Sequence, residues 1–331
     1  MNFLYSQLFV TPTIPTADLT GHTLIITGSN TGLGFTAAQH IARLQPTRLV
    51  LAVRTPAKGE KARQEIINSI PDFDTSKTTI EVWQLDMSSF SSVLAFSDRC
   101  STDLVRLDGV SLNAGIQVSS HELMEGYEST IAVNVISTFL LAIALLPTLR
   151  KSAHKHNITP RLSIVSSETH AWASFPEKAT PQGQSILKAM SDPSKKISSM
   201  RYMDSKLIQI LVFRHLYRTF TSHEQDNDGR ITWNILNPGF CYSELGRDGN
   251  ALQSVMRFLL ARTQEMGGRP IAAGLVAGVE TDGMYMHDGV VDEAALSAYV
   301  KSEEGEQMGA RLWAELRDIY EELRPGITKG L

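Results

Sequence analysis

Short apolar runs alternate with helical patterns along most of the chain. "TLIITG" (23–28) precedes the pattern "GLGFTAAQHIARL" (32–44), and "RLVLAVR" (48–54) precedes "KGEKARQEIINSI" (58–70). Short runs rich in β-branched residues are typical of buried strands, and apolar residues at helical spacing are typical of amphipathic helices. Further strand-like runs lie at 80–86, 108–115, 161–167, 231–239 and 283–289.

This alternation predicts an α/β fold, a doubly wound parallel β-sheet of the Rossmann type with helices on both faces. Ligands of such sheets bind beyond the carboxyl ends of the strands, so the residues that end each strand are site candidates. No linker rich in Pro, Gly or Ser divides the chain. We therefore expect a single domain over residues 21–290, with an N-terminal extension (1–20) and a C-terminal helical extension (291–331).

Composition narrows the class of protein. The chain has 331 residues, 42% of them hydrophobic and 20% charged, which is typical of a soluble globular protein. A net charge of −4 argues against a nucleic-acid partner, which would require a basic face. Cys100 and Cys241 lie far apart, and the histidines show no metal spacing, so we expect no metal site. Two free thiols fit a reducing compartment, and we expect a cytoplasmic protein.

No run reaches the roughly 18 apolar residues that a transmembrane helix needs. The best candidate, "FLLAIALLP" (139–147), is short and is interpreted as a buried helix. The N-terminal "MNFLYSQLFVTPTIP" is apolar but lacks the basic region of a signal peptide. It is interpreted as a short helix packed on the body, with weak attachment to a membrane surface as the open alternative.

The stretch "TGSNTGLG" (27–34) joins the first predicted strand to the first predicted helix. Gly28, Gly32 and Gly34 follow a GxxxGxG pattern. Glycine permits a tight turn and a close approach of the backbone to a pyrophosphate, and a helix N-terminus attracts anions. Glycine-rich turns also occur as plain loops, but between a strand and a helix the pattern predicts a dinucleotide site.

The end of the second strand predicts which dinucleotide binds. It reads "LAVRTPAK", with Arg54 and Lys58 and no acidic residue. A carboxylate here would bind the ribose 2′-OH of NAD, whereas an arginine suits the 2′-phosphate of NADP. We therefore predict NADP(H) as the cofactor, with a simply solvated Arg54 as the alternative.

Other predicted strands also end in polar residues. Asp86 in "QLDMSS" either accepts a hydrogen bond from adenine or caps the next helix, and both roles are compatible. Asn113 in "LNAG" can tie neighbouring strands together, and the small pair that follows it lets the backbone lie against a ribose. Ser166 and Ser167 end the fifth strand, where a plain loop would also place serines.

Two helical patterns carry polar residues on apolar faces. In "RYMDSKLIQI", Tyr202 and Lys206 are four positions apart and would share one helix face. A chance pairing on a helix surface is the alternative to a chemical one. Asn134 in "IAVNVIST" interrupts an apolar helix and needs a buried partner, as a satisfied core asparagine would have.

In combination and in this order, these motifs resemble the short-chain dehydrogenase/reductase family from about residue 20 to 290. They are TGxxxGxG, the strand-end Asp, NAG, the helix Asn, the strand-end Ser, YxxxK and "NPGFCYS". The resemblance is to the retinol-dehydrogenase-like branch. The phrases "SNTGLG", "LAVR", "SLNAGI" and "NPGFCYSEL" are particularly similar to reductases of fungal secondary metabolism.

The resemblance implies a role for each catalytic candidate. Tyr202 would be the general acid that protonates a carbonyl oxygen, or the base in the reverse direction. Lys206 would lower the pKa of Tyr202, which is ordinarily near 10, and would bind the nicotinamide ribose. Ser167, the second of its pair, would orient the substrate oxygen, and Asn134 would hold a water in a proton relay that ends at Lys206.

The resemblance also assigns cofactor binding to residues at the strand ends. They are Gly28, Asn30, Thr31, Gly32, Leu33, Gly34, Arg54, Asp86, Met87, Asn113, Ala114, Gly115, Tyr202, Lys206, Pro238, Gly239 and Ser243. Ser243 stands where the family usually has Thr. The interval between Ser167 and Tyr202 is longer than usual, and we expect its insertion (about 171–200) to form an added helix and loop. Residues 240–266 correspond to the substrate lid, and His170 is a candidate at the border of the substrate site.

The sequence therefore predicts an NADP(H)-dependent oxidoreductase that interconverts a ketone or aldehyde and an alcohol. Its partner would be an apolar small molecule, of the polyketide or terpenoid secondary-metabolite type. A non-redox isomerase, dehydratase or cyclase on the same scaffold is the first alternative, and a catalytically silent dinucleotide sensor is the second. Many family members are oligomers, so a homodimer is an expectation, which the insertion and the tail weaken.

Overall fold

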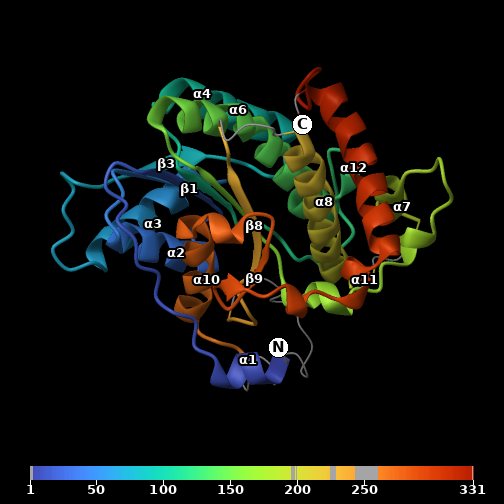
Figure 1. Cartoon of the computed structure of the whole chain (residues 1–331), viewed down its shortest axis with the longest axis horizontal. Helices are drawn as coiled ribbons and strands as arrows, with labels where there is room; N and C mark the ends of the chain where they lie inside the picture. The colour runs from blue at the N-terminus through green and yellow to red at the C-terminus, as the bar shows by residue number, and fades with distance from the viewer. Residues whose placement is uncertain (1–2, 195–197, 199, 224–228, 243–259, 330) are drawn as a thin grey trace.

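The computed structural model describes residues 3–194, 198, 200–223, 229–242, 260–329 and 331. Within them an eight-stranded sheet has the order β10-β9-β8-β7-β4-β1-β2-β3 (Figure 1). The strands are β1 (Thr23–Thr27), β2 (Arg48–Val53), β3 (Thr79–Gln84), β4 (Gly109–Leu112), β7 (Arg161–Val165), β8 (Thr232–Asn237), β9 (Tyr285–His287) and β10 (Val290–Val291). All neighbouring pairs are parallel except β9 and β10. The predicted doubly wound parallel sheet is confirmed.

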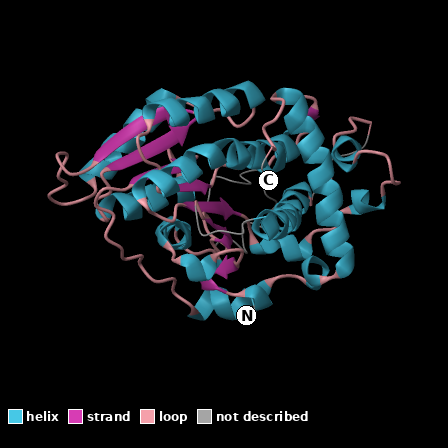
Figure 2. Cartoon of the chain, turned by 45° about the horizontal axis from the view of Figure 1, so that its top comes forward, coloured by secondary structure: helices cyan, strands magenta, loops and turns pink. Residues whose placement is uncertain are grey.

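Helices cover both faces of the sheet (Figure 2). One face carries α2 (Gly32–Arg43), α3 (Pro56–Asn68) and α10 (Gln264–Val276), and the other carries α4 (Phe90–Asp103), α6 (Thr138–His156) and α8 (Arg201–His223). The long α12 (Glu303–Leu323) runs along the outer side of α8 (Figure 1). Shorter elements are α1 (Phe3–Phe9), α5 (Ser129–Ile131), α7 (Ile186–Met190), α11 (Ala298–Lys301), the hairpin β5 (Leu123–Met124) and β6 (Tyr127–Glu128), the π-helix η1 (Ala132–Ser137), and the 3₁₀ turns η2 (Glu168–Trp172), η3 (Pro176–Ala179), η4 (Val279–Thr281) and η5 (Glu293–Ala295).

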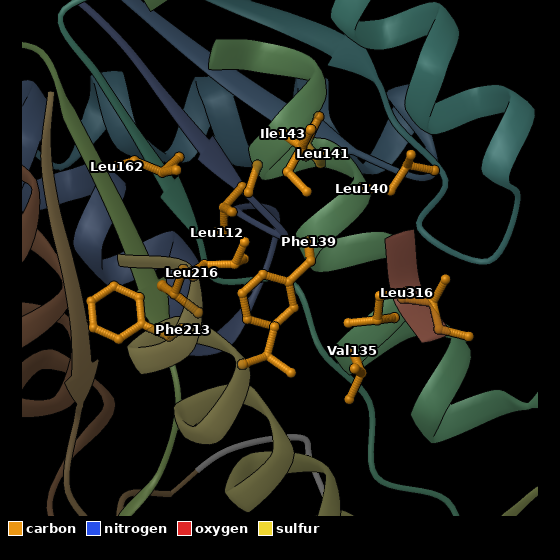
Figure 3. Packing of buried hydrophobic residues seen from close by; sticks show 14 of the residues in the cluster. Leu112, Val135, Phe139, Leu140, Leu141, Ile143, Leu162, Phe213, Leu216 and Leu316 are labelled. Atoms are coloured by element: carbon orange, nitrogen blue, oxygen red, sulfur yellow. The ribbon is translucent and has the colours of Figure 1, made fainter. Parts of the chain in front are cut away.

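The strands are apolar throughout because both of their faces are buried. On β1, Leu24 and Ile26 pack with α2 and α10, whereas Ile25 between them joins the opposite core. The larger core lies between the sheet and α4, α6, α8 and α12, where Phe139, Phe213 and neighbouring leucines interdigitate (Figure 3). Full burial of each such side chain contributes about 1.5–3 kcal/mol, so this core holds α8 firmly against the strand ends.

The expectation that no segment is apolar enough for a transmembrane helix is wrong for one helical segment. In the described part of the chain, 129–156 is long and apolar enough to cross a membrane, with a mean hydropathy of 2.2 over its most apolar window. Counting uninterrupted apolar residues missed it, because its Asn, Ser and Thr residues break the run without greatly lowering the mean. However, 94% of that window is buried inside the protein. The interpretation of 139–147 as a buried helix is confirmed.

The N-terminal helix α1 is attached to the body by a buried ion pair. Arg262 Nη1 lies 2.5 Å from Asp288 Oδ1, and both side chains are 3% exposed. Arg262 Nη2 donates to the main-chain oxygen of Ser6 at 2.6 Å, and Ser6 Oγ donates to Asp288 Oδ2, also at 2.6 Å. The guanidinium and the carboxylate thereby pair with each other and hold the helix, as buried charges require, although Arg262 Nε itself has no hydrogen-bond partner among the described residues.

This arrangement predicts a large cost for removing one charge. The Arg262→Met variant should lose about 3–5 kcal/mol of unfolding free energy, because Asp288 would stay buried without its partner. Arg324→Met is the matched control, since its pair with Asp98 is exposed and should contribute at most about 1 kcal/mol. Denaturant unfolding of the two variants measures the difference. Equal losses would contradict the interpretation.

Candidate active site

The turn after β1 can be made only by glycines. Gly28 has φ +66°, and a methyl group on Gly34 would overlap Asn113 Nδ2 and the main-chain oxygen of Gly28. Gly32 has φ +61° and meets no atom within 4 Å of the place where a Cβ would lie. Gly28 and Gly34 therefore close the turn, and Gly32 leaves open space in front of it.

The N-terminus of α2 lies directly behind this open space and suits an anion. Its N-cap residue, Thr31, makes no side-chain cap bond, and its first turn holds no acidic residue. The first N–H groups of the helix are thus left for a ligand, and the helix dipole favours negative charge there. These features fit a dinucleotide pyrophosphate.

Thr27 and Asn113 lock the ends of β1 and β4 together. Asn113 Nδ2 donates to the main-chain oxygen of Thr27 at 2.8 Å. Thr27 Oγ1 accepts from the N–H groups of Asn113 and Ala114, each at 2.9 Å. The prediction that Asn113 ties neighbouring strands is confirmed, and the bonds fix the Ala114 backbone at the edge of the cavity.

The ends of β2 and β3 contribute charged groups to the same cavity. Arg54 and Lys58 are exposed and line the same cavity as the glycine turn. Asp86 also lines it and accepts from the N–H and hydroxyl of Ser88 at 2.9 and 2.6 Å. The interpretation of Asp86 as a helix cap is wrong, because α4 starts at Phe90 and Ser89 caps it.

Tyr202 and Lys206 face the cavity from the first two turns of α8. Lys206 is 4% exposed, and its Nζ donates to the main-chain oxygen of Val165 at 2.9 Å and to Gln209 Oε1 at 3.1 Å. Burial lowers the pKa of Lys206 to about 7, while the two acceptors favour its charged form. Nζ lies 5.6 Å from the ring centroid of Tyr202, yet the pKa of that phenol is raised above its ordinary value, so the lowering expected from Lys206 is not found.

Ser167 is arranged to donate a hydrogen bond. Its Oγ accepts from the N–H and the hydroxyl of Thr169, at 3.2 and 3.0 Å, so its own proton is left for another acceptor. Burial raises the pKa of Tyr202 to about 12, and a hydrogen bond with Ser167 opposes this rise. Ser166, by contrast, donates to the main-chain oxygen of Lys206 and is 2% exposed. Ser166 rather than Ser167 lines the cavity, but the Ser166 hydroxyl is used by the main chain, whereas Ser167 is the serine hydrogen-bonded to Tyr202.

Asn134 lies behind the cavity wall on the π-helix η1 and is fully buried. Its Oδ1 accepts from the N–H of Ile116 at 2.8 Å, and its Nδ2 donates to the Ile116 oxygen at 2.9 Å and to Ser205 Oγ at 3.1 Å. A Cβ on Gly115 would lie 3.2 Å from Asn134 Oδ1, so only glycine separates this side chain from the ligand space. Short π-helical turns inside α-helices are frequent at functional sites.

His170 supports the serine segment from behind. Its Nε2 accepts from the N–H of Ser297 at 3.2 Å, so the ring proton must be on Nδ1, which donates to the Ser167 oxygen at 2.9 Å. Burial lowers the pKa of His170 to about 4, so the ring is neutral at ordinary pH. The side chain is 1% exposed. Its place is therefore beneath the site and not at the substrate border that the sequence suggested.

One cavity of about 530 Å³ brings most of the predicted site residues together. From that set it is lined by Gly28, Asn30, Thr31, Gly32, Leu33, Gly34, Arg54, Asp86, Met87, Asn113, Ala114, Gly115, Tyr202, Lys206 and Pro238. Among the described residues of the set, Asn134, Ser167 and Gly239 do not line it, and Ser243 lies outside the described residues. Gly239 turns away with φ +83°, where a Cβ would meet Arg262.

Sequence reasoning missed several residues of the site. Apolar side chains such as Ile116, Val118 and Met124 line the cavity, but no motif distinguished them from core residues. Gln209, which binds Lys206, was also missed. The sequence feature that could have identified it is an amide within an apolar helical run, three positions after Lys206 and on the same helix face as Tyr202.

Known proteins are similar to this chain in sequence. The short chain dehydrogenase family model matches residues 22–171. A Penicillium roqueforti short-chain dehydrogenase, anuD, is 40% identical over 331 residues, covering 99% of this chain and 84% of that protein. A Cryptosporiopsis short chain dehydrogenase/reductase, dmxR8, is 39% identical over 333 residues, covering 99% of each. The chain therefore belongs to the short-chain dehydrogenase/reductase family, which uses NAD(P)(H), and its resemblance to fungal members is confirmed.

Solved structures agree on the fold. The Pseudomonas aeruginosa RhlG/NADP active-site complex has a TM-score of 0.57 at 20% identity, covering 82% of this chain and 95% of that chain. A short-chain type dehydrogenase/reductase from Mycobacterium marinum has a TM-score of 0.60 at 18% identity, covering 82% of this chain and 94% of that chain. At these identities the likeness establishes the Rossmann-type architecture.

The burial of Lys206 predicts a pH-dependent stability. Folding lowers the pKa of this lysine from 10.5 to about 7, so between these values the unfolded chain binds more protons than the folded chain. The free energy of unfolding attributable to Lys206 therefore rises with pH from about 7 to 10.5 and is lost as pH falls back through 7. We expect wild type to gain stability relative to Lys206→Met over this range, as measured by denaturant unfolding at a series of pH values. A difference that stays constant with pH would contradict the lowered pKa.

Proposed function

We propose that this protein is an NADP(H)-dependent oxidoreductase that reduces a ketone or aldehyde of an apolar small molecule to the alcohol. The observation that carries the proposal is a single cavity lined by the glycine turn, by Arg54 and by the Tyr202–Lys206 pair. A dinucleotide with its pyrophosphate at α2 and its 2′-phosphate at Arg54 would extend toward Tyr202. The cofactor, when bound, supplies the hydride.

The protein's own residues supply orientation and the proton. Ser167, which is hydrogen-bonded to Tyr202 in this structure, would turn its hydroxyl to the substrate oxygen and hold the carbonyl beside Tyr202 by a hydrogen bond, keeping its own proton. Tyr202 then protonates that oxygen as negative charge develops on it, and Lys206 stabilises the resulting phenolate by its nearby charge. Because burial keeps the pKa of Tyr202 near 12, the phenol holds its proton at neutral pH. The phenol is therefore available as a proton donor, as carbonyl reduction requires.

The lining of the cavity supports an apolar substrate. Ile116, Val118 and Met124 line the cavity together with Val133 on η1, and Gln117 is the polar residue among them. Apolar walls with few polar groups favour a substrate that leaves water readily. Together with the phrases shared with reductases of fungal secondary metabolism, this lining supports a polyketide- or terpenoid-type substrate.

Removing the Tyr202 hydroxyl should separate chemistry from binding. With the apolar diketone 9,10-phenanthrenequinone as probe, Tyr202→Phe should lower kcat by about 10²–10⁴-fold, because the proton donor is lost. NADPH binding, followed by fluorescence titration, should stay within about twofold, since the ring and Lys206 remain. Tyr5→Phe is the matched control, because Tyr5 is 56% exposed on α1. Unchanged turnover in Tyr202→Phe would reject this mechanism, and turnover without NADPH consumption would favour the non-redox alternative.

Arg54 should decide the choice of dinucleotide. Arg54→Ala should weaken NADPH binding by roughly 10- to 100-fold, the usual effect of losing a charge-assisted hydrogen bond. NADH binding should be nearly unchanged, because NADH has no 2′-phosphate. Arg43→Ala, at the exposed end of α2, is the control. Fluorescence titrations with both dinucleotides measure these effects, and a wild-type preference for NADH would show that the NADP assignment is wrong.

A further inference from the structure

Gln209 is a buried polar residue in the helix that carries the catalytic pair. It is 1% exposed, and it follows Lys206 by three positions and Tyr202 by seven on α8. At this spacing the three side chains lie along one face of the helix. A buried amide costs free energy unless it is hydrogen-bonded, so its partners indicate why an amide occupies this place.

Both ends of the Gln209 amide are bonded to groups of the active site. Its Oε1 accepts from Lys206 Nζ at 3.1 Å, and its Nε2 donates to the main-chain oxygen of Asn134 at 2.6 Å. An ammonium can only donate and a carbonyl oxygen can only accept. The orientation of the amide is therefore determined by its partners.

This bridge is the connection between Asn134 and Lys206. The Asn134 side chain is bonded to Ile116 and Ser205, and the group of Asn134 that takes part in the bridge is its main-chain oxygen. That oxygen lies within the π-helix η1, where the backbone bonding pattern departs from the α-helix. The family resemblance implies a water between these two residues, whereas here a side chain of the protein spans the gap.

An amide and a water differ in what they can pass on. A water can take up a proton on one side and release another, whereas an amide would have to go through its unfavourable imidic acid form. We propose that Gln209 is a positioning residue that holds Lys206 through a direct bridge to Asn134, in place of a relay water. Protons then reach Tyr202 by a route that does not pass through Asn134. The proposal rests on the acid–base role of Tyr202 and Lys206 proposed above.

Two replacements of Gln209 distinguish this role from simple packing. Gln209→Leu keeps about the same volume, removes both hydrogen bonds and excludes water. Gln209→Ala leaves space in which a water can bridge Asn134 and Lys206 again. With 9,10-phenanthrenequinone and NADPH, we expect Leu to lower kcat by about tenfold with little change in KM, since Lys206 loses a fixed partner. We expect Ala to keep kcat within about threefold.

Packing alone would give the opposite order. A volume-conserving Leu would then be more active than Ala, which leaves a cavity. An Ala variant less active than the Leu variant, or a Leu variant with wild-type kcat, would overturn the proposal. Gln307→Leu is the control, because Gln307 is exposed on α12 and should leave kcat unchanged.

A second measurement tests the bridge without any turnover. For each Gln209 variant, the free energy of unfolding is measured against pH with Lys206 in place and with Lys206→Met. The pH at which the difference between the two begins to rise reports the pKa of Lys206 in the folded protein. The groups that face Lys206 are Tyr202 on its own helix, the Val165 oxygen at the end of β7, Gly115 after β4 and Asn134 on η1, and of these only Tyr202 titrates. Gln209→Glu should move that pH upward, because a carboxylate favours the ammonium, and Gln209→Leu should move it downward.

The two measurements separate failure of this inference from failure of the proposed function. An identical pH in the Glu and Leu variants would overturn the bridge, whether or not the protein reduces a carbonyl. A wild-type protein that reduces no carbonyl in a broad panel would overturn the proposed function, and the shift of that pH would then decide the bridge by itself.

Discussion

Lys206 brings a positive charge into a place almost closed to solvent, and a buried charge must be matched by acceptors. Val165 at the end of β7 supplies one oxygen and Gln209 supplies another, so strand and helix are held in a defined register. Gln209 is in turn held by the Asn134 oxygen. The placement of Tyr202 one turn before Lys206 follows from this arrangement, because both side chains belong to the same helix face.

The acceptors around Lys206 are the Val165 oxygen and the Gln209 amide, which are both neutral. A carboxylate would stabilise the ammonium more strongly, but it would also cancel the field that the ammonium exerts on Tyr202. A carbonyl and an amide orient the ammonium without neutralising its charge. The N-terminus of α2 likewise has no acidic side chain in its first turn, so no carboxylate competes there with an anionic ligand.

Several site residues could be identified from the sequence because their chemistry is local. Gly28 and Gly34 are required by one turn, and Tyr202 and Lys206 share a face by helix period. The sequence marked Asn134 as unusual. It did not indicate which atom of Asn134 is bridged to Lys206, because that depends on a π-helix that the local sequence pattern does not reveal. For His170, position three after Ser167 suggested the substrate border, whereas its bond to Ser297 places it beneath the serine.

The sequence by itself determined the order of strands and helices, the glycine turn and the spacing of the catalytic pair, because each depends on residues within one or two turns of chain. The tertiary structure alone decided the contacts between distant segments. Arg262 meets Ser6 and Asp288, His170 meets Ser297, and Gln209 meets Asn134. Such contacts form because buried polar groups take whichever partner the packed core brings within reach, and a linear pattern does not record which partner that is.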